Sequence, residues 1–484
     1  MKKKNILKAI AFICIFVLIF NYISNVFRAK WLVGCSETYM MEEFYELEDN
    51  SIDVCILGSS QMVYGMSALR MLDKYGISAF GTATGSQPML CTYFYLKELD
   101  KTQDFSTAIL DISMLYEQEE DSRFRKTIDN VPFSKNKLDL IWEYTKGSDL
   151  QEKWENIFSI FQYHSRWDEL EQGDFDYENM ESSLFKGTAL RGEVRNDIIY
   201  EDIVTDGGEI DSELTMNENQ KKYFVWIVDY CKENDIHLVL IKTPKRSWNR
   251  TKQLGAAELA EEYGLDYLDF NSKELVEAID LDIPKDFADP DHLNIRGTSK
   301  LTDYLCEYLL ERYEYRDSRK EAYYDEAEMN RFRADFENKW LRTETDAVAF
   351  LKLLQGSDYE IALQASGDIS AGLSDEIKTE FANIGIDVSE IKDNYVAYIK
   401  DDKCEYKETA TEPIEYIGKF SDGKSFKLLS DVTDIESETK TYVAGNKTAY
   451  AMRGINMIIY RADSNKTIRC ATLYVDETGT MRLR

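Results

Sequence analysis

The sequence predicts an α/β domain built on a parallel sheet, preceded by one apolar helix and followed by a smaller domain. Between about residues 51 and 315, apolar strand-like runs alternate with amphipathic helical patterns, which is typical of a parallel sheet. After residue 346, short strand-like runs follow one another, which favours an α+β domain or a β-sandwich. Near the amino terminus, Ala9 to Val26 form an apolar run about as long as a bilayer core requires.

Length and charge restrict the organisation further. A chain of 484 residues exceeds one ordinary core, so two or three domains are expected. The net charge of −31 argues against a nucleic-acid partner, because binding to phosphates depends on Lys and Arg. We expect these segments: 1–30, a cytoplasmic stub and transmembrane anchor; 31–50, a juxtamembrane stretch; 51–315, the α/β domain, with an insertion at about 117–215; 316–345, a charged helical linker; and 346–484, the second domain.

The amino terminus predicts a single-pass membrane protein. Lysines precede the apolar run, which favours a cytoplasmic amino terminus and places the rest of the chain outside the cell. No small-x-small cleavage site follows directly, so we expect an uncleaved anchor. Leu32-Val33-Gly34-Cys35 resembles a lipoprotein box, but Arg28 and Lys30 separate it from the apolar run, and we do not expect lipidation of Cys35.

The cysteines are scattered, and most lie in apolar contexts that suit small buried side chains. No Cys-x-x-Cys or His-rich spacing occurs, so neither a zinc site nor another cofactor is expected. Cys404 and Cys470 are the one pair that we consider for a disulfide, since both belong to the second domain outside the membrane.

Two stretches carry candidate chemistry. Asp53 to Leu57 predict a buried strand that ends in Gly58-Ser59-Ser60, and ligands of open α/β sheets bind beyond the carboxyl ends of strands. Small residues after a strand are also typical of a plain turn, so this pattern alone is weak. The second stretch, Asp289-Pro290-Asp291-His292, can aim a base and an orienting carboxylate at a serine.

Few histidines compete for the role of base. The chain has three, His164, His237 and His292, and His237 falls inside an apolar strand pattern, where we expect a core residue.

Together, the two stretches resemble the SGNH/GDSL hydrolase superfamily, over roughly residues 50 to 315. The family's first block is Gly-Asp-Ser and its last is Asp-x-x-His. The resemblance implies a flavodoxin-like parallel sheet, with Ser60 as nucleophile, His292 as base and Asp289 as orienting group. Ser59 replaces the Asp of the first block, a departure shared with cell-envelope branches such as the teichoic acid D-alanyl transfer protein and alginate O-acetylation proteins.

The oxyanion hole departs from the family pattern. The resemblance implies backbone donors at Ser60 and Ala83, and Ala83 stands where the family has Gly. The family's third-block Asn is absent from the end of the strand predicted over 107–113, and Ser113 is the candidate replacement. Losing such a donor costs on the order of 3 kcal/mol of transition-state stabilisation. Either another donor is used, or the activity is specialised or weak.

Several polar residues are candidates for a substrate pocket. An aromatic, a His and an Arg occur together in the insertion, and sugars stack on aromatic faces while Arg forks around anions. The alternative is a helix that packs one ring and solvates its charges, and the sequence favours it slightly. The candidates are His164, Arg166 and Trp167 in the insertion, Lys242 at a strand's carboxyl end, and Gln87 after the second strand.

The second domain carries a resemblance of its own. Arg453-Gly454-Ile455-Asn456 followed by an apolar strand is similar to the interleukin-like EMT-inducer (stem-type) domain, over roughly residues 346 to 484. This resemblance implies a carbohydrate-binding module, and a structural or dimerising module is equally compatible.

These expectations combine into one hypothesis and one rival. The first is a membrane-anchored extracellular serine esterase or O-acyltransferase that acts on acyl groups of cell-envelope polysaccharide, with a membrane-bound O-acyltransferase as partner. The rival is a non-catalytic glycan-binding or scaffold protein on a degenerate SGNH fold.

Overall fold

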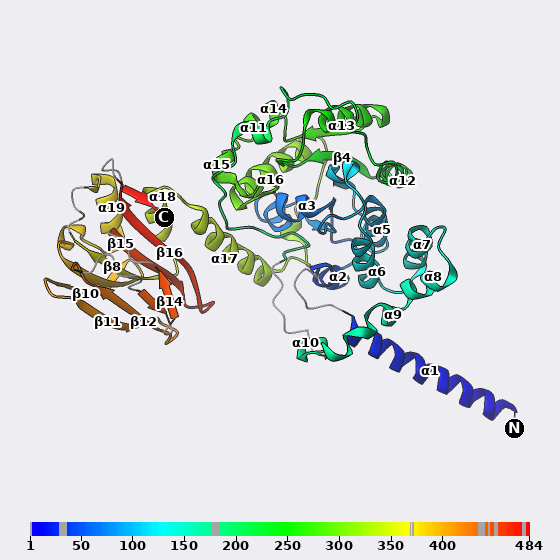
Figure 1. Cartoon of the computed structure of the whole chain (residues 1–484), viewed down its shortest axis with the longest axis horizontal. Helices are drawn as coiled ribbons and strands as arrows, with labels where there is room; N and C mark the ends of the chain where they lie inside the picture. Colours follow the sequence, from blue (N-terminus) through cyan, green and yellow to red (C-terminus); the bar gives the residue numbers. More distant parts are fainter. Residues whose placement is uncertain are drawn as a thin grey trace. The chain divides into compact units, whose positions relative to one another are not determined.

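A computed structural model describes residues 2–28, 36–175, 184–367, 369, 372–433, 441–443, 446–449, 454–476 and 481–484 (Figure 1). The chain forms two compact units, Met1–Ala334 and Asp335–Arg484. Each unit is described by itself.

The first unit is built on a five-stranded parallel sheet in the order β2-β1-β3-β4-β5. The first three strands in this order are short and fully buried, as parallel strands covered on both faces should be. The parallel α/β sheet predicted from the sequence is therefore present. The strands are β1 (Val54–Leu57), β2 (Ala79–Gly81), β3 (Thr107–Asp111), β4 (His237–Lys242) and β5 (Asp266–Asp269).

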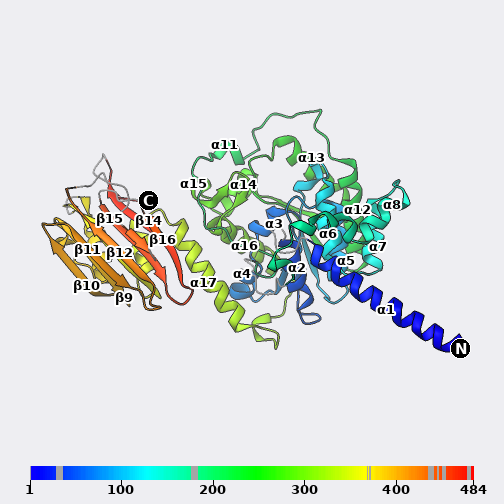
Figure 2. The ribbon, with the colours of Figure 1, turned by 60° about the horizontal axis from the view of Figure 1, so that its bottom comes forward.

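Helices cover both faces of this sheet (Figures 1 and 2). Cys55 and Leu57 of β1 face one core, which contains α5 (Met89–Leu99) and α12 (Glu218–Glu233). The alternate residues of β1 face the other core, with α3 (Ser60–Gly65) and α16 (Ile295–Leu310). The remaining helices are α2 (Ser36–Tyr45), α4 (Ala68–Arg70), the π-helix η1 (Met71–Tyr75), α13 (Arg250–Tyr263), α14 (Lys273–Ala278) and α15 (Ile283–Asp286).

The insertion between β3 and α12 is largely helical. It contains η2 (Ser113–Tyr116), α6 (Asp121–Asn130), α7 (Lys135–Tyr144), α8 (Leu150–Ile157), α9 (Ile160–Tyr163), η3 (His164–Asp168), α10 (Gln172–Phe175) and α11 (Tyr200–Ile203). Figure 1 shows α7 and α8 at the end of this unit from which α1 (Lys2–Phe27) projects.

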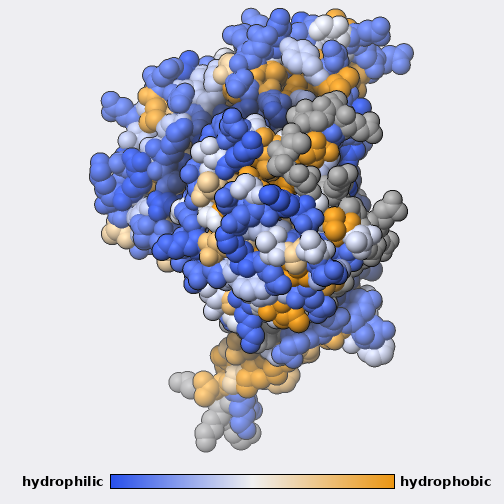
Figure 3. Space-filling view, turned by 90° about the vertical axis from the view of Figure 1, so that its left-hand side faces the viewer, coloured by the Kyte–Doolittle hydropathy of each residue, from blue (hydrophilic) through white to orange (hydrophobic). Residues whose placement is uncertain are grey.

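The apolar amino-terminal run forms α1, which is visible at the bottom of Figure 3. Its segment Asn5–Phe27 is long and apolar enough to cross a membrane, and a signal sequence would share these properties. Cys35 lies outside the described residues.

The second unit contains two antiparallel sheets. A six-stranded sheet in the order β10-β9-β8-β15-β16-β17 packs its inner face on a four-stranded sheet, β11-β12-β13-β14, through a small core. Helices α18 (Ala347–Leu354) and α19 (Asp375–Asn383) cover the other face of the larger sheet. The unit thus combines the two predicted alternatives. Its strands are β8 (Tyr359–Ser366), β9 (Asn394–Lys400), β10 (Lys403–Ala410), β11 (Ile414–Lys419), β12 (Ser425–Ser430), β13 (Thr441–Val443), β14 (Asn446–Ala449), β15 (Gly454–Arg461), β16 (Lys466–Val475) and β17 (Met481–Leu483).

The disulfide considered for Cys404 and Cys470 does not form, and both thiols are free. Cys404 lies on β10 and Cys470 on β16, with three strands between them in the sheet. At about 4.8 Å per strand they are roughly 19 Å apart, whereas bridged Cα atoms lie within about 7 Å.

The predicted linker is helical, as expected, but it is not solvated along its whole length. Its main helix is α17 (Glu326–Thr343), and the boundary between the two units falls inside it. Met329 and Phe332 of this helix are buried.

Candidate active site

The turn after β1 has a conformation that only glycine accepts easily. Gly58 has a φ of +141°, and a Cβ there would meet Met62 Cγ at 2.9 Å and Asp111 Cβ at 3.1 Å. The chain can therefore pass close to the end of β3 and turn directly into α3. Helix α3 begins at Ser60 itself, and Ser59 caps it by accepting a hydrogen bond from the Gln61 N–H.

A short hairpin presents the Asp and the His. β6 (Phe287–Asp289) pairs with β7 (His292–Leu293), and Asp289 stands opposite His292 in the register. Asn294 anchors the hairpin, because its side chain caps α16 and also donates to the Phe287 carbonyl. The side chains of Asp289 and His292 therefore project from the same side of the hairpin.

The structure aligns Ser60, His292 and Asp289 as a triad. The Ser60 hydroxyl oxygen lies 2.9 Å from His292 Nε2. On the other side of the ring, Nδ1 lies 3.0 Å from each carboxylate oxygen of Asp289. A hydroxyl, an imidazole and a carboxylate in this order can move the hydroxyl proton to the ring while the carboxylate stabilises the resulting charge.

The electrostatic surroundings keep Asp289 ionised. Its partial burial alone would raise the pKa of the carboxyl group. The Asp291 N–H donates to it at 2.9 Å, and its hydrogen bond with His292 and its ion pair with Arg191 also favour the charged form, so the pKa of Asp289 ends below its usual range. An ionised Asp289 is the form that holds the Nδ1 proton of His292.

Two side chains that were not predicted from the sequence brace the triad from the side. Tyr64 lies one helical turn after Ser60 and meets the His292 ring edge to face, with centroids 5.3 Å apart. The Arg191 guanidinium lies 5.3 Å from the Tyr64 ring and bonds Asp289. Spacing on α3 could have suggested Tyr64, but no local pattern marks Arg191.

Arg191 belongs to a stretch of the insertion that runs across the whole site, and we call residues 186–195 the strap. Its backbone joins β2, α3, β6 and the start of α16. Two strap carbonyl oxygens accept, that of Lys186 from the Gly81 N–H at 2.9 Å and that of Arg191 from the Ile295 N–H at 2.8 Å. Two strap N–H groups donate, that of Ala189 to the Val63 carbonyl at 2.8 Å and that of Arg195 to the Phe287 carbonyl at 2.7 Å. The strap thus fixes the serine helix and the Asp-His hairpin relative to each other.

Gln61 provides a second connection beneath the triad. Its side-chain amide donates to the carbonyl oxygen of Asp291, the residue before His292. Its amide oxygen accepts from the Thr243 hydroxyl at 2.6 Å and from Lys242 Nζ at 3.3 Å. The residue after Ser60 therefore holds the residue before His292.

Lys242, a candidate for the substrate pocket, is instead buried inside the fold. Its side chain is fully buried beside Asp111, with Nζ 3.7 Å from a carboxylate oxygen. Burial lowers the pKa of Lys242 to about 8, although Asp111 favours its charged form. Lys242 is thus an internal support for Gln61.

The expected oxyanion donors differ in their surroundings. Ala83 is buried beside the turn that precedes Ser60, where Ser59 pairs with Thr84 in an isolated parallel bridge, and the φ of Ala83 is not positive. Alanine therefore fits this backbone without strain. Ser113 is less suited as a donor, because its hydroxyl donates to Asp111 and its oxygen lies 3.3 Å from Ser59 rather than beside Ser60.

The other pocket candidates are also engaged elsewhere. Gln87 is buried and bonds Thr84 and Thr92. Arg166 pairs with Asp174 and donates to the Phe27 carbonyl. His164 contacts the Phe161 carbonyl, and Trp167 is 70% exposed. His164 and Arg166 are thus held by the insertion and by α1, and the closeness of a ring, a His and an Arg in the sequence does not indicate a pocket at Ser60.

We expected His237 to be a core residue, and this prediction is wrong. His237 is exposed at the start of β4, with its ring stacked on Tyr313 at 4.4 Å. The start of β4 is the opposite end of the strand from Lys242.

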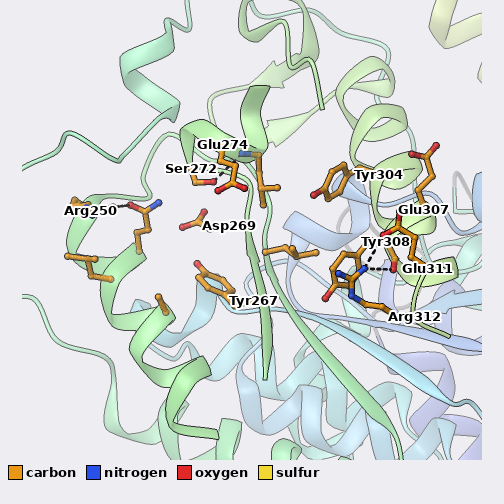
Figure 4. Close-up of a pocket in the computed structure, with 15 residues that line it drawn as sticks. Arg250, Tyr267, Asp269, Ser272, Glu274, Tyr304, Glu307, Tyr308, Glu311 and Arg312 are labelled. Carbon is orange, nitrogen blue, oxygen red and sulfur yellow. Dashed lines mark hydrogen bonds and ion pairs between the residues drawn. The ribbon is translucent and has the colours of Figure 1, made fainter. Parts of the chain in front are cut away.

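A cavity of ≈ 580 Å³ lies away from the triad, beside the edge strand β5 (Figure 4). Tyr267 and Asp269 line it from β5, and Tyr304 and Tyr308 line it from α16. We take the triad as the candidate site, because the cavity residues include no paired nucleophile and base. Within the described ranges, no group of three or more His, Cys, Asp or Glu is placed to hold a metal ion.

Neither a scan against protein-family models nor a search of curated proteins finds a match for this chain.

Proposed function

We propose that this chain is an SGNH-type serine esterase or O-acyltransferase, anchored in the cell membrane with its bulk outside the cell. Its substrates would be acyl groups, acetyl above all, of cell-envelope polysaccharide. The observation that carries the proposal is the 2.9 Å contact between Ser60 Oγ and His292 Nε2, with Asp289 on the far side of the ring. The amino-terminal span and the lysines before it support the location.

The reaction follows from the order of the three groups. Ser60 Oγ attacks the acyl carbonyl as its proton passes to His292 Nε2, and the carbonyl electrons move onto oxygen. The backbone N–H groups of Ser60 and Ala83 would receive this oxyanion. Collapse expels the oxygen of the acyl donor, which is a sugar oxygen in the esterase. This oxygen takes the proton from His292, and the acyl group stays on Ser60.

Deacylation repeats these steps with a second oxygen nucleophile. His292 removes a proton from water in a hydrolase or from a sugar hydroxyl in a transferase, and Ser60 is released. For the transferase, a membrane-bound O-acyltransferase would supply the acyl group. The second domain would hold the polysaccharide.

The test uses the full chain in detergent, an aryl acetate as substrate and a phosphonate that labels activated serines. Wild type should hydrolyse the ester and take the label, whereas Ser60→Ala and His292→Ala should lose both. Ser59→Ala is the matched control, since Ser59 neighbours the nucleophile but lies against Ser113. Labelling that persists in Ser60→Ala would refute the assignment.

A second candidate is a non-catalytic glycan-binding or scaffold protein. The engagement of the Ser113 hydroxyl by Asp111 favours it, because the end of β3 then lacks the family's side-chain donor. This candidate predicts no phosphonate labelling in any variant, together with binding of envelope polysaccharide that Ser60→Ala leaves unchanged.

A further inference from the structure

The helical insertion exposes an unusual number of large apolar side chains. In the part of the chain that the structure describes, every exposed tryptophan lies there: Trp142 is 55%, Trp154 54% and Trp167 70% exposed. Other exposed apolar side chains of the same helices and their connections are Phe133, Leu150, Phe161 and Phe175. Exposed apolar groups gathered on one region mark a contact surface rather than a solvated one. We call residues 121–175 the platform.

The platform is attached to the end of the apolar helix α1. Arg166 donates to the Phe27 carbonyl at 2.6 Å, and Arg28 donates to the Asp129 carbonyl at 2.7 Å. Figures 1 and 2 both show α7 and α8 at the end of the unit from which α1 projects. The platform therefore adjoins the segment that can cross a membrane.

The contact reaches well inside that segment. Phe158 meets the Phe20 ring edge to face at 5.4 Å, and Phe158 in turn stacks on Trp154 at 5.8 Å. Phe20 lies seven residues before the end of α1 at Phe27, which is about 10 Å along the helix axis. When α1 spans a bilayer, α8 and α9 must then lie at the depth of the interface, where apolar faces of surface helices enter by about 5–10 Å.

The chemistry of the exposed residues fits this depth. Tryptophan is enriched where membrane meets water, because its ring is apolar and its N–H remains able to bond. Val17, Phe20, Phe133 and Phe158 also line a cavity of ≈ 410 Å³ between α1 and the platform, which has room for part of an acyl chain.

We propose that the platform rests in the interface of the leaflet from which α1 emerges, with lipid as its occupant. The proposal rests on α1 crossing the bilayer, and it does not depend on catalysis at Ser60. It assigns the exposed rings of α7, α8 and η3 to lipid contact.

The test places the full chain in nanodiscs of phosphatidylcholine with brominated acyl chains, which quench tryptophan emission only on contact. The variants Trp142→Phe, Trp154→Phe and Trp167→Phe keep an apolar ring and should each lose part of the quenched emission. Trp248→Phe is the matched control, since Trp248 is buried in the core of the sheet domain. Its removal should leave the quenched emission unchanged.

Two outcomes would overturn the proposal. If the three variants keep the full quenched emission of wild type and acrylamide quenches these rings freely, the platform faces water. If acrylamide is excluded but bromine has no effect, another protein or a second copy of the chain covers the platform. Loss of phosphonate labelling at Ser60 would leave the lipid result untouched, so failure of the two proposals can be told apart.

Discussion

Replacing Asp289 by Asn should show how much the negative charge of this side chain contributes to kcat when its size is kept. The substitution keeps the size of the side chain but removes the negative charge that faces His292 Nδ1 at 3.0 Å. Two unit charges about 4 Å apart interact by about 4 kcal/mol at the effective dielectric of a protein surface. Because about 1.4 kcal/mol corresponds to a factor of ten in rate, kcat should fall by about 10³.

The amide also alters which ring nitrogen carries the proton. If its NH₂ group faces Nδ1, the imidazole is held with its proton on Nε2, which then points at Ser60 and cannot accept. The loss of charge and the altered position of the ring proton both lower kcat.

The assay is hydrolysis of an aryl acetate by the full chain, with KM and kcat measured separately. KM should change little, since Asp289 faces His292 and Arg191 rather than an acyl group. Asp291→Asn is the matched control, because it removes the same charge two residues away while the Asp291 N–H still donates to Asp289. A kcat for Asp289→Asn close to that of Asp291→Asn would refute the proposed role of Asp289.

Three further predictions concern the support of the site. Gln61→Leu removes the donor to the Asp291 carbonyl and should destabilise the fold by about 2 kcal/mol; thermal unfolding measures this, and kcat should fall with KM preserved. Gly58→Ala should unfold at lower temperature and lose activity, because alanine is strained at a φ of +141° and its Cβ would meet Met62; wild-type melting would contradict the turn geometry. For Lys242, burial lowers the pKa to about 8 from its ordinary 10.5, so the unfolded chain binds more protons above about pH 8. The free energy of unfolding should therefore rise between about pH 8 and 10.5, and a Lys242→Met variant that shows the same rise would refute the assignment.

The parts of the molecule that could be predicted are those whose burial produces a local pattern in the sequence. The apolar run before Gly58 predicts β1, because a strand that is covered on both faces is apolar at successive positions. The pair Asp289 and His292 could also be predicted, since both groups lie on one turn.

The supports of the triad could not be predicted, because they depend on tertiary contacts. Arg191 stands 98 positions before Asp289, and nothing near it in sequence indicates a carboxylate partner. The opposite error concerns His164, Arg166 and Trp167, whose closeness in sequence suggested a pocket. Their side chains diverge, and the fold holds Arg166 against the end of α1.

Strand order caused the remaining error. Cys404 and Cys470 share a sheet, but the order of the strands within it places β9, β8 and β15 between them. Strand patterns give the period of the side chains and not the neighbours of a strand, so a disulfide cannot be inferred from them.

The insertion links the two proposals made for this chain. A crossover from β3 to β4 needs only one helix to return along the sheet, and here α12 makes that return. The residues between β3 and α12 are therefore not needed for the crossover. Their first half carries the platform, which contacts α1, and their second half carries the strap, which bonds the serine helix and the Asp-His hairpin. One stretch of chain thus contributes both the surface proposed to meet lipid and the backbone that fixes the triad.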